Sequence, residues 1–456
     1  MKNKKIAVLL KYFKGELNPF DGAALECALE TGAQVTAVAM SPASVLPALQ
    51  SLTRLGVKAV LISDPLYAGS DTQATSYVLA EALKRISPDM IFCGRQSVDG
   101  DTAQVPPMLA QRLGLDFKPK IVSMQGSEAR LRSGEICFLR DNAVYTFEKI
   151  KTLRCPSIFS KIGEVEVWNN QTLGLSAQRC GLQGSPTRVV RAYESSVGRR
   201  YCSFMEAYQL DELIASGLER SRKEWAQPSQ ERLETVGFVG NVSAIAQGVA
   251  HRAIEIDACG KTPERVAEEI LDSGVKHVIW EDSEELKTLA ARVAVITGAG
   301  LCADCIAFRV ERGNLVMTRP AQGGNVTADI VCEGVLAFAT ARTAQKDGAD
   351  VVFSVGKGGI EQIEKITELA KKYGAEVCCS RSVADSGRLP YEKQVGLTGR
   401  VVSPKVYVAF GISGAVQHTC AIEGAGTVIA VNTDKNARIF DYADYGIITE
   451  VKNVEL

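Results

Sequence analysis

The chain has 456 residues, of which 46% are hydrophobic and 23% are charged, a composition typical of a folded globular protein with about three domains. Its net charge of −1 excludes a strongly basic surface for nucleic acid or for an anionic membrane. Small molecules and proteins remain as the expected partners.

At the N-terminus, lysines precede the apolar run IAVLL, which ends at Lys11 and fits a core strand better than a signal peptide. No apolar segment approaches the ~18 residues of a membrane span. We therefore expect a cytoplasmic protein without membrane insertion, whose thirteen cysteines are reduced thiols. The one CxxC, Cys302 to Cys305, has no second pair at zinc spacing, so we expect no metal.

Short apolar runs then alternate with amphipathic stretches. We expect strands at KIAVLLK, AQVTAVAM, VKAVLISD and MIFCG, and helices that begin near Ala23, Ser44 and Thr72. This βαβα order predicts the α/β fold class, with parallel sheets covered by helices on both faces.

A partial internal repeat pairs LTRLGVKAVLISD (52–64) with ILDSGVKHVIWED (270–282), which indicates two related α/β domains. A polar, charge-dense stretch between them predicts a helix followed by a linker. A further strand opens at DGADVVFSVG. The predicted organisation is a first domain at 1–205, a linker at 206–234, a second domain at 235–346 and a third at 347–456.

A polar loop, CGRQSVDGDTAQVPPML (93–109), follows the strand MIF and leads into a helix predicted near Thr102. Gly94 and Arg95 suit contact with a phosphate, and acids such as Asp99 or Asp101 suit contact with a ribose. These residues alone leave an ordinary surface loop equally open.

The C-terminal part has the pattern of a cofactor pocket. The apolar run VYVAFGI (406–412) ends at Ser413-Gly414 and continues as AVQH, as a buried strand does when it turns into a helix start with free N–H groups. A second strand, TVIAVNTD, ends in polar residues, where α/β sheets bind ligands. A phosphate-bearing cofactor fits both ends.

In order and spacing, QVGLTGR, GISGAVQH, VNTD and ADYG resemble the FAD domain of the α subunit of electron-transfer flavoproteins over roughly 345–456. Residues 1–205 resemble the β subunit, and 235–345 resemble a shortened first domain of the α subunit. The resemblance implies two fused subunits with the β-like half first. It also implies doubly wound sheets of the adenine nucleotide α-hydrolase type and a C-terminal FAD-binding α/β domain.

The resemblance implies a role for His418 as the hydrogen-bond donor to the negative charge that a reduced flavin carries around N1 and O2. It places Arg381 against the isoalloxazine face and Thr398 near N5, whereas an isolated histidine is more often a core residue bonded to backbone. The implied FAD-site residues are Lys357, Ser380, Arg381, Gln394, Val395, Gly396, Leu397, Thr398, Ser413, Gly414, Ala415, Val416, Gln417, His418, Asn432 and Glu450.

Three positions depart from the family pattern. Leu397 stands where glutamine is usual, Glu450 where aspartate is more usual, and Lys357 where arginine is common. Leu397 removes one polar contact with the flavin, while the other two keep the charge.

The loop after MIF resembles the nucleotide loop of the β subunit, and NPFD matches that subunit's second contact segment. Simple members bind AMP there, whereas electron-bifurcating members have GRQxxDGDTAQVGP and bind a second FAD. This chain follows the second pattern except at Pro106, and GSDTQAT and LQGSPT agree with it. The implied residues are Asn18, Phe20, Asp21, Gly94, Arg95, Gln96, Asp99, Asp101, Thr102 and Gln104.

We therefore expect a soluble FAD-dependent electron carrier between a dehydrogenase, or NADH, and another flavoenzyme or quinone-linked acceptor. One alternative is a flavin-based electron-bifurcating NADH oxidoreductase with two FAD. Another is a nucleotide-binding scaffold without redox activity. The partner stays open because GEVEVWNNQTLGLSAQ replaces the family's NEPRYxxLP-like docking segment after LRCPSIFSKI, a run that resembles a strand.

Overall fold

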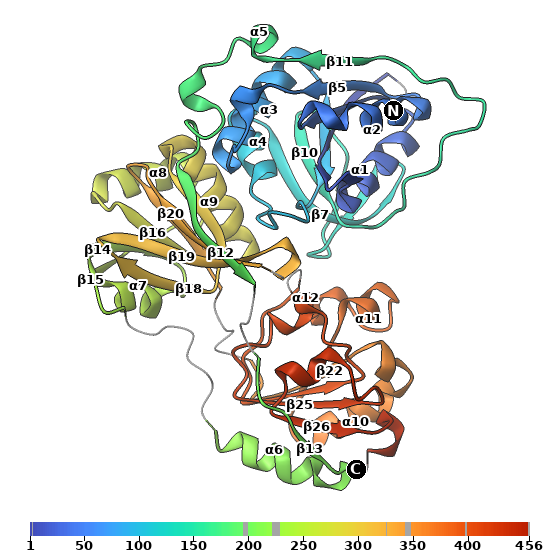
Figure 1. Ribbon diagram of the computed structural model, residues 1–456, viewed down its shortest axis with the longest axis vertical. Coiled ribbons are helices and arrows are strands. Elements are labelled where there is room, and N and C mark those ends of the chain that lie inside the picture. Colours follow the sequence, from blue (N-terminus) through green and yellow to red (C-terminus); the bar gives the residue numbers. More distant parts are fainter. Residues whose placement is uncertain are drawn as a thin grey trace. The chain divides into compact units, whose positions relative to one another are not determined.

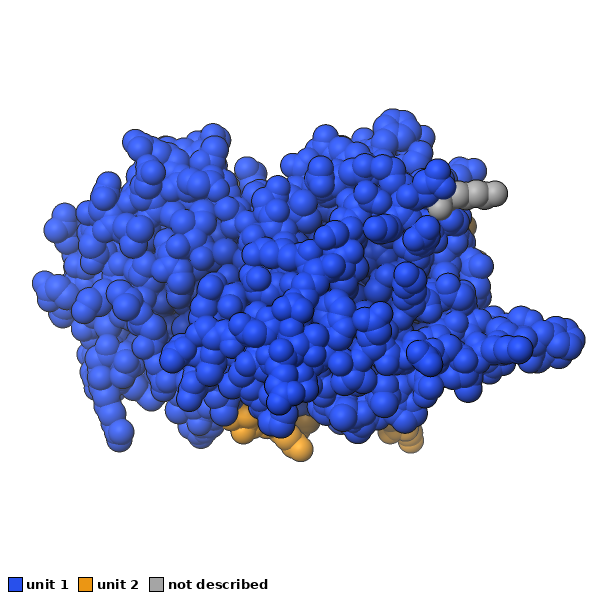
Figure 2. Space-filling view, turned by 90° about the horizontal axis from the view of Figure 1, so that it is seen from above, with its two compact units in different colours: residues 1–191, 229–322, 329–341 blue, residues 192–228, 323–328, 342–456 orange. Residues whose placement is uncertain are grey.

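The computed structural model (Figure 1) describes residues 1, 3–194, 199–220, 229–324, 326–342, 348–396 and 399–454. The chain forms two compact units, which Figure 2 colours separately. Unit 1 comprises residues 1–191, 229–322 and 329–341, and unit 2 comprises residues 192–228, 323–328 and 342–456. Both units contain parallel sheets with helices, so the predicted α/β fold class is confirmed.

The first sheet of unit 1 has the order β11-β5-β4-β1-β6-β10-β7-β8-β9 and is parallel from β11 to β7. Its strands are β1 (Lys5–Leu10), β4 (Gln34–Met40), β5 (Lys58–Ile62), β6 (Met90–Gly94), β7 (Asp116–Gln125), β8 (Glu128–Leu131), β9 (Ile136–Phe138), β10 (Ala143–Phe147) and β11 (Val165–Trp168). A small hairpin, β2 (Tyr12–Phe13) with β3 (Glu16–Leu17), follows β1.

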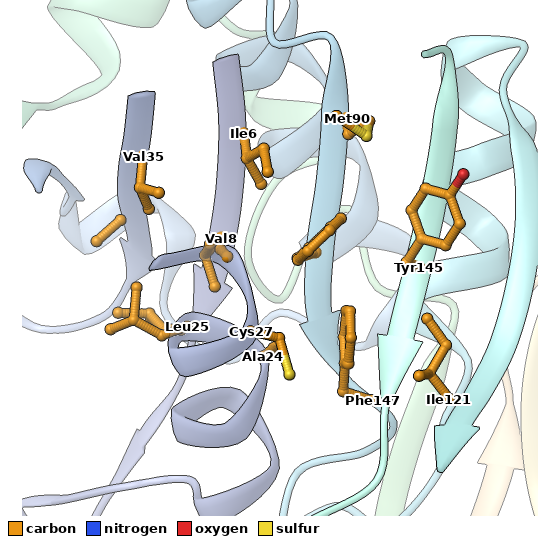
Figure 3. Packing of buried hydrophobic residues seen from close by; sticks show 14 of the residues in the cluster. Ile6, Val8, Ala24, Leu25, Cys27, Val35, Met90, Ile121, Tyr145 and Phe147 are labelled. Carbon is orange, nitrogen blue, oxygen red and sulfur yellow. The ribbon is translucent and has the colours of Figure 1, made fainter. Parts of the chain in front are cut away.

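Helices cover both faces of this sheet because its central strands are apolar on both sides. Along β1, Ile6 and Val8 pack with Leu25 of α1 (Figure 3), whereas Ala7 and Leu9 belong to the opposite cluster, which includes residues of α3 and α4. The helices are α1 (Pro19–Glu30), α2 (Leu46–Leu52), α3 (Thr72–Ile86), α4 (Val105–Leu113) and α5 (Asn170–Leu173).

The second sheet of unit 1 is parallel with the order β15-β14-β16-β21-β17. The amide of Gln73 in α3 donates to the carbonyls of Ala294 and Ala299, at 2.6 and 2.8 Å, and so links the two halves of unit 1. The elements are β14 (Leu233–Val239), β15 (Ala250–Glu255), β16 (His277–Glu281), β17 (Gly300–Cys305), β21 (Ala337–Ala341), α7 (Ser243–Val249), α8 (Pro263–Ser273) and α9 (Glu284–Thr297).

The internal repeat does not mark equivalent strands. Residues 52–64 contain β5, which lies two strands from β1, whereas residues 270–282 contain β16, which lies directly beside the first strand β14. The topological counterpart of β16 is therefore β6. The shared GVK segment reflects the common ending of a helix at glycine before a strand, at Gly56 and Gly274, both of which have left-handed backbone.

A further sheet has the order β12-β20-β19-β18, and β18 and β19 form an antiparallel hairpin. Its strands are β12 (Thr187–Glu194), β18 (Ala307–Glu311), β19 (Asn314–Ala321) and β20 (Val326–Cys332).

Unit 2 contains one six-stranded parallel sheet with the order β13-β26-β25-β24-β22-β23. One face packs against α6 and α10, and the other packs against the segments that follow β24 and β25. The elements are β13 (Ser203–Met205), β22 (Val351–Val355), β23 (Glu376–Cys379), β24 (Val406–Phe410), β25 (Thr427–Asn432), β26 (Tyr445–Ile448), α6 (Leu210–Leu218), α10 (Ile363–Lys372), α11 (Arg381–Asp385) and α12 (Val416–Thr419).

The units divide the chain differently from the boundaries expected near residues 205 and 235. β13 pairs with β26, and α6 buries Leu210, Leu213 and Ile214 in the core of unit 2. Part of the segment expected as a linker is therefore a structural part of unit 2. A helix was expected in this stretch, but not one whose narrow apolar face packs into a core.

The run LRCPSIFSKI is not a strand, which corrects that expectation. It forms a loop before β11, and its Ile158 and Phe159 are 84% and 86% exposed. Among the described residues, no helix combines the length and apolarity needed to cross a bilayer.

Candidate functional site

A cavity of about 850 Å³ lies in unit 1 at the carboxyl ends of β1, β4, β5 and β6. The chain leaves β1 toward β4 on one side, while β6 pairs with β1 on the other. This reversal of strand order opens a crevice outside the strand ends, where open α/β sheets bind their ligands.

The cavity brings together most of the residues expected for the first nucleotide site. Those that line it are Asn18, Asp21, Gly94, Gln96, Asp99, Thr102 and Gln104. Phe20, Arg95 and Asp101 are not in the lining.

Asp21 fastens the ends of two strands. Its Oδ1 accepts a hydrogen bond from the backbone N–H of Gly94 at 2.9 Å, and its Oδ2 accepts one from the backbone N–H of Lys11 at 2.8 Å. Burial raises the pKa of Asp21 to about 7, against the opposing effect of these hydrogen bonds. A Cβ atom at Gly94 would lie 2.3 Å from Oδ1, so only glycine permits this close approach.

Arg95 is directed away from the cavity. Its side chain is 5% exposed, its Nε lies 3.4 Å from Oε1 of Glu148, and its guanidinium lies 5.4 Å from the centroid of the Phe20 ring. Asp101 likewise serves the loop itself, because its Oδ1 accepts from Nε2 of Gln96 at 2.9 Å. Two expected ligand contacts are thus occupied with protein partners.

Gln104 is the strongest sign of a polar ligand. It is fully buried, lines the cavity, and neither its Nε2 nor its Oε1 has a hydrogen-bond partner among the described residues. Oδ1 of Asn18 and Oδ1 of Asp99 are also buried without a hydrogen-bond partner among the described residues. Buried polar atoms without partners are costly, so a ligand that supplies donors and acceptors here would be stabilised.

Sequence reasoning missed Lys11, whose Nζ lies 2.8 Å from Oδ2 of Asp99, as well as Ser41 and Ser63 in the lining. Each directly or closely follows a strand, so the rule that ligands bind at strand ends would have identified them. The segments GSDTQAT and LQGSPT also meet here. The Thr187 hydroxyl donates to Oδ2 of Asp71 at 2.7 Å, and Asp71 lines the cavity.

The residues expected for the FAD site of unit 2 also follow strands. Lys357 comes after β22, Ser380 and Arg381 after β23, Ser413 after β24 and Asn432 after β25. Because all strands of this sheet are parallel, these positions share one edge. Glu450 follows β26 at the same edge.

The loops after β22 and β24 are in close contact. The N–H of Gly358 donates to the carbonyl of Gly411 at 3.0 Å. Gly411 has a φ of 63°, and a Cβ atom there would lie 2.4 Å from the backbone nitrogen of Gly359. Only glycine permits both the left-handed conformation and this approach.

Backbone hydrogen bonds hold the described residues on both sides of positions 397 and 398. The N–H of Val395 donates to the carbonyl of Cys379 at 2.8 Å, and that of Arg400 donates to the carbonyl of Gln394 at 2.8 Å. A Cβ atom at Gly396 would lie 3.0 Å from the carbonyl oxygen of Gln417, which places Gly396 beside α12. Leu397 and Thr398 lie outside the described residues.

Exposed and buried residues alternate from 413 to 418, through the loop that leads into the single turn of α12. Ser413, Ala415 and Gln417 are exposed, whereas Gly414, Val416 and His418 are buried. The exposed positions can meet a ligand, and the expected helix start is confirmed at Val416, although it supplies only one turn of aligned N–H groups.

His418 is 6% exposed, and its Nε2 lies 2.7 Å from the hydroxyl oxygen of Tyr407. Nδ1 is buried and makes no close, well-aligned hydrogen bond among the described residues. Burial lowers the pKa of His418 to about 4, against the opposing effect of a weaker backbone hydrogen bond with Val395. The ring is therefore neutral at neutral pH, and its Nδ1 lacks a strong protein partner.

Three other expected residues make protein contacts. Nδ2 of Asn432 donates to the carbonyl of Ile412 at 2.8 Å, and its Oδ1 accepts from the N–H of Asp434 at 3.0 Å. Nε of Arg381 lies 3.4 Å from Asp385, and Oε2 of Glu450 lies 2.5 Å from Nζ of Lys452. Asn432 thus orients the 411–414 loop, and its expected contact with adenosine stays a prediction.

No cluster of three or more potential metal ligands occurs among the described residues. Cys302 and Cys305 are buried thiols with their sulfur atoms 3.5 Å apart.

Comparisons with known proteins agree with this arrangement. The electron transfer flavoprotein domain matches residues 7–132 and 249–375, and the electron transfer flavoprotein FAD-binding domain matches residues 347–423. Protein FixB of Azorhizobium caulinodans is 34% identical over 36% of this chain and 57% of its own length. The electron transfer flavoprotein subunit alpha of Thermoanaerobacterium thermosaccharolyticum is 34% identical over 37% of this chain and 65% of its own length.

The chain therefore spans less than two thirds of the length of these two relatives. Protein FixA of Azorhizobium caulinodans is 34% identical over 45% of this chain and 84% of its own length. Because the domain match covers more than half of the chain, the protein belongs to the electron transfer flavoprotein family and contains that family's FAD-binding domain.

Proposed function

We propose that this protein is an FAD-dependent electron carrier whose redox flavin binds at the strand-end edge of unit 2. The observation that carries the proposal is His418, a buried neutral imidazole within the match to the FAD-binding domain, whose Nδ1 makes no close, well-aligned hydrogen bond among the described residues. Bound FAD supplies the chemistry of accepting and giving up electrons. The imidazole supplies a hydrogen-bond donor where negative charge gathers on the reduced ring.

The remaining residues at this edge suit the rest of the dinucleotide. Ser413 and Gln417 are exposed beside the start of α12, where a diphosphate meets N–H groups and side-chain donors. Arg381 and Ser380 begin α11 at the end of β23, and Lys357 begins the segment after β22. Each supplies a donor or a positive charge that complements an anionic cofactor.

We further propose that the cavity of unit 1 binds a second FAD, with AMP as the alternative. Its volume of about 850 Å³ lies in the upper part of the range of roughly 300–1,000 Å³ for small-molecule sites, which favours the larger ligand. The unpartnered amide of Gln104 supports a polar occupant of either kind. Two flavins would favour the electron-bifurcating reading, in which NADH is the donor.

The matches to both FixA and FixB support a fusion of two subunit types in one chain. The proposed partner is a redox protein such as a flavin dehydrogenase or a quinone oxidoreductase, because an electron carrier requires a donor and an acceptor.

Denaturing release of the cofactors from the purified chain, with chromatographic identification and an anaerobic NADH titration followed at the flavin absorbance, tests the proposal. Two FAD per chain that NADH bleaches support bifurcation. One FAD plus AMP without bleaching supports a simple carrier. A colourless chain that takes up no added FAD would overturn the proposal and favour a nucleotide-binding scaffold.

A further inference from the structure

Tyr407 and His418 form a buried pair on one face of the sheet of unit 2. Tyr407 is fully buried in β24, and His418 is 6% exposed in α12. The hydroxyl oxygen lies 2.7 Å from Nε2, and the two ring centroids are 6.1 Å apart. β24 lies between β22 and β25, with Tyr407 paired to Val352 and Val428, so its backbone is fixed on both sides.

Only one proton lies between the hydroxyl oxygen of Tyr407 and Nε2 of His418, and either group can donate it. A neutral imidazole has one N–H and one acceptor nitrogen, and a phenol has one O–H. If the hydroxyl donates, Nε2 accepts and the imidazole proton is on Nδ1. If Nε2 donates instead, Nδ1 has only a lone pair and cannot donate to a ligand. The two arrangements therefore give Nδ1 opposite chemistry.

We propose that Tyr407 donates its hydroxyl proton to Nε2 of His418 and thereby fixes the tautomer in which Nδ1 carries the proton. This inference rests on the proposed function, because Nδ1 is then the donor that faces the reduced flavin. Tyr407 acts through His418 and is a positioning residue.

Two observations support this direction of donation. Burial raises the pKa of Tyr407 well above its ordinary value, against the opposing effect of a side-chain hydrogen bond with Ser354, so the phenol keeps the proton that this donation requires. Nδ1 is buried and makes no close, well-aligned hydrogen bond among the described residues, while the ring's weaker backbone hydrogen bond with Val395 raises its pKa, as expected of a ring N–H that points toward a carbonyl.

The tautomer is measurable without any assay of electron transfer. The chain has three histidines, so ¹⁵N-histidine labelling and two-bond ¹H–¹⁵N correlation give three ring systems, which His418→Gln assigns. We expect His418 of the full-length protein to be protonated at Nδ1. In Tyr407→Phe, Nε2 loses its donor, and we expect the population to move to the Nε2–H form. A wild-type His418 protonated at Nε2 overturns the inference.

The second measurement is the flavin reduction potential by dye-calibrated titration. We expect Tyr407→Phe to weaken binding of reduced flavin about tenfold relative to oxidised flavin, a shift of about 30 mV toward more negative potential for a two-electron couple. Tyr442→Phe, which removes another buried tyrosine hydroxyl of unit 2, is the control and should leave the potential unchanged.

The outcomes separate the inference from the proposed function. Equal potentials in wild type and Tyr407→Phe, both loaded with FAD, overturn the inference alone. A wild-type protein that takes up no FAD overturns the proposed function, while the tautomer measurement still decides the role of Tyr407. Should Tyr407→Phe fail to fold by circular dichroism, the wild-type tautomer remains decisive.

Discussion

Arg400 and Glu376 form a two-point ion pair in which Nη1 lies 2.6 Å from Oε1 and Nη2 lies 3.1 Å from Oε2. Glu376 belongs to β23, and the N–H of Arg400 donates to the carbonyl of Gln394. Nζ of Lys393 lies 2.7 Å from the same carboxylate. The pair therefore holds a turn of the expected flavin site against the sheet.

This pair makes stability depend on acid pH. The hydrogen bonds from Arg400, with that from Lys393, lower the pKa of Glu376 to about 2 from an ordinary value of 4.5. The unfolded chain binds the proton first, so the stabilisation is full above about pH 4.5 and is lost as the pH falls toward 2. Urea unfolding between pH 3 and 6 should show this loss in wild type and a smaller one in Glu376→Gln. Glu364→Gln, at an exposed position of α10, should behave as wild type, and identical pH slopes in all three proteins would refute the role of the pair.

His418→Ala should make the flavin harder to reduce. Loss of a hydrogen bond to a charged acceptor costs about 1.5–3 kcal/mol, so the reduced flavin should bind about 10- to 150-fold more weakly while the oxidised flavin changes little. The reduction potential of the purified variant is the measurement. His251→Ala, at an exposed position of unit 1, serves as the control. An unchanged potential in His418→Ala would remove the residue from the site.

Gly94→Ala should destabilise unit 1. The added Cβ would lie 2.3 Å from Oδ1 of Asp21 and 2.8 Å from its backbone nitrogen, and such overpacking costs about 1–3 kcal/mol. The measurement is the urea midpoint of unit 1. Gly248→Ala is matched, because a Cβ there meets nothing within 4 Å and it lies in α7, where alanine is favoured by about 0.5–1 kcal/mol. Equal midpoints for the two variants would show that the strand end does not depend on this approach.

Gln104→Leu should separate binding from stability. Its amide has no protein partner among the described residues, so leucine should leave the nucleotide-free protein equally stable or more stable while the nucleotide content of unit 1 falls. Gln111 in α4, the helix that directly follows Gln104, is the counterpart. It donates to Glu264 at 2.9 Å and accepts from Arg292 at 2.8 Å, so Gln111→Leu should cost about 1 kcal/mol and keep the nucleotide. Full nucleotide content in Gln104→Leu would contradict the proposed site.

The sequence predicted central strands of the parallel sheets because a buried parallel strand has a short run of apolar residues. VYVAF and TVIAVN became β24 and β25 at the expected residues, and the ligand-facing ends followed from their positions. Helix starts were less certain: α1 begins at Pro19 and not near Ala23, since a proline at the first helical position sets the start.

The directions of side chains and the contacts between residues far apart in the chain could not be predicted from local sequence patterns. Arg95 follows β6 as expected, but whether it turns toward the cavity or toward Glu148 depends on a residue from β10's end that no local pattern reveals. The Tyr407–His418 contact was not predicted, because in the sequence Tyr407 fits the apolar pattern of a buried strand and nothing indicates a polar partner for its hydroxyl. β13 was missed because a three-residue edge strand carries little periodicity.

β13 and α6 are synthesised well before the other strands of the sheet that they complete, because residues 229–322 and 329–341 of unit 1 are translated in between. Their apolar side chains therefore stay exposed to solvent until the C-terminal part of the chain has been synthesised. Unit 2 is thus built from separate segments of the chain. A protein cut at residue 342 would leave β13 and α6 on the N-terminal fragment without the sheet they pack on, and would leave β26 on the C-terminal fragment without its edge-strand partner.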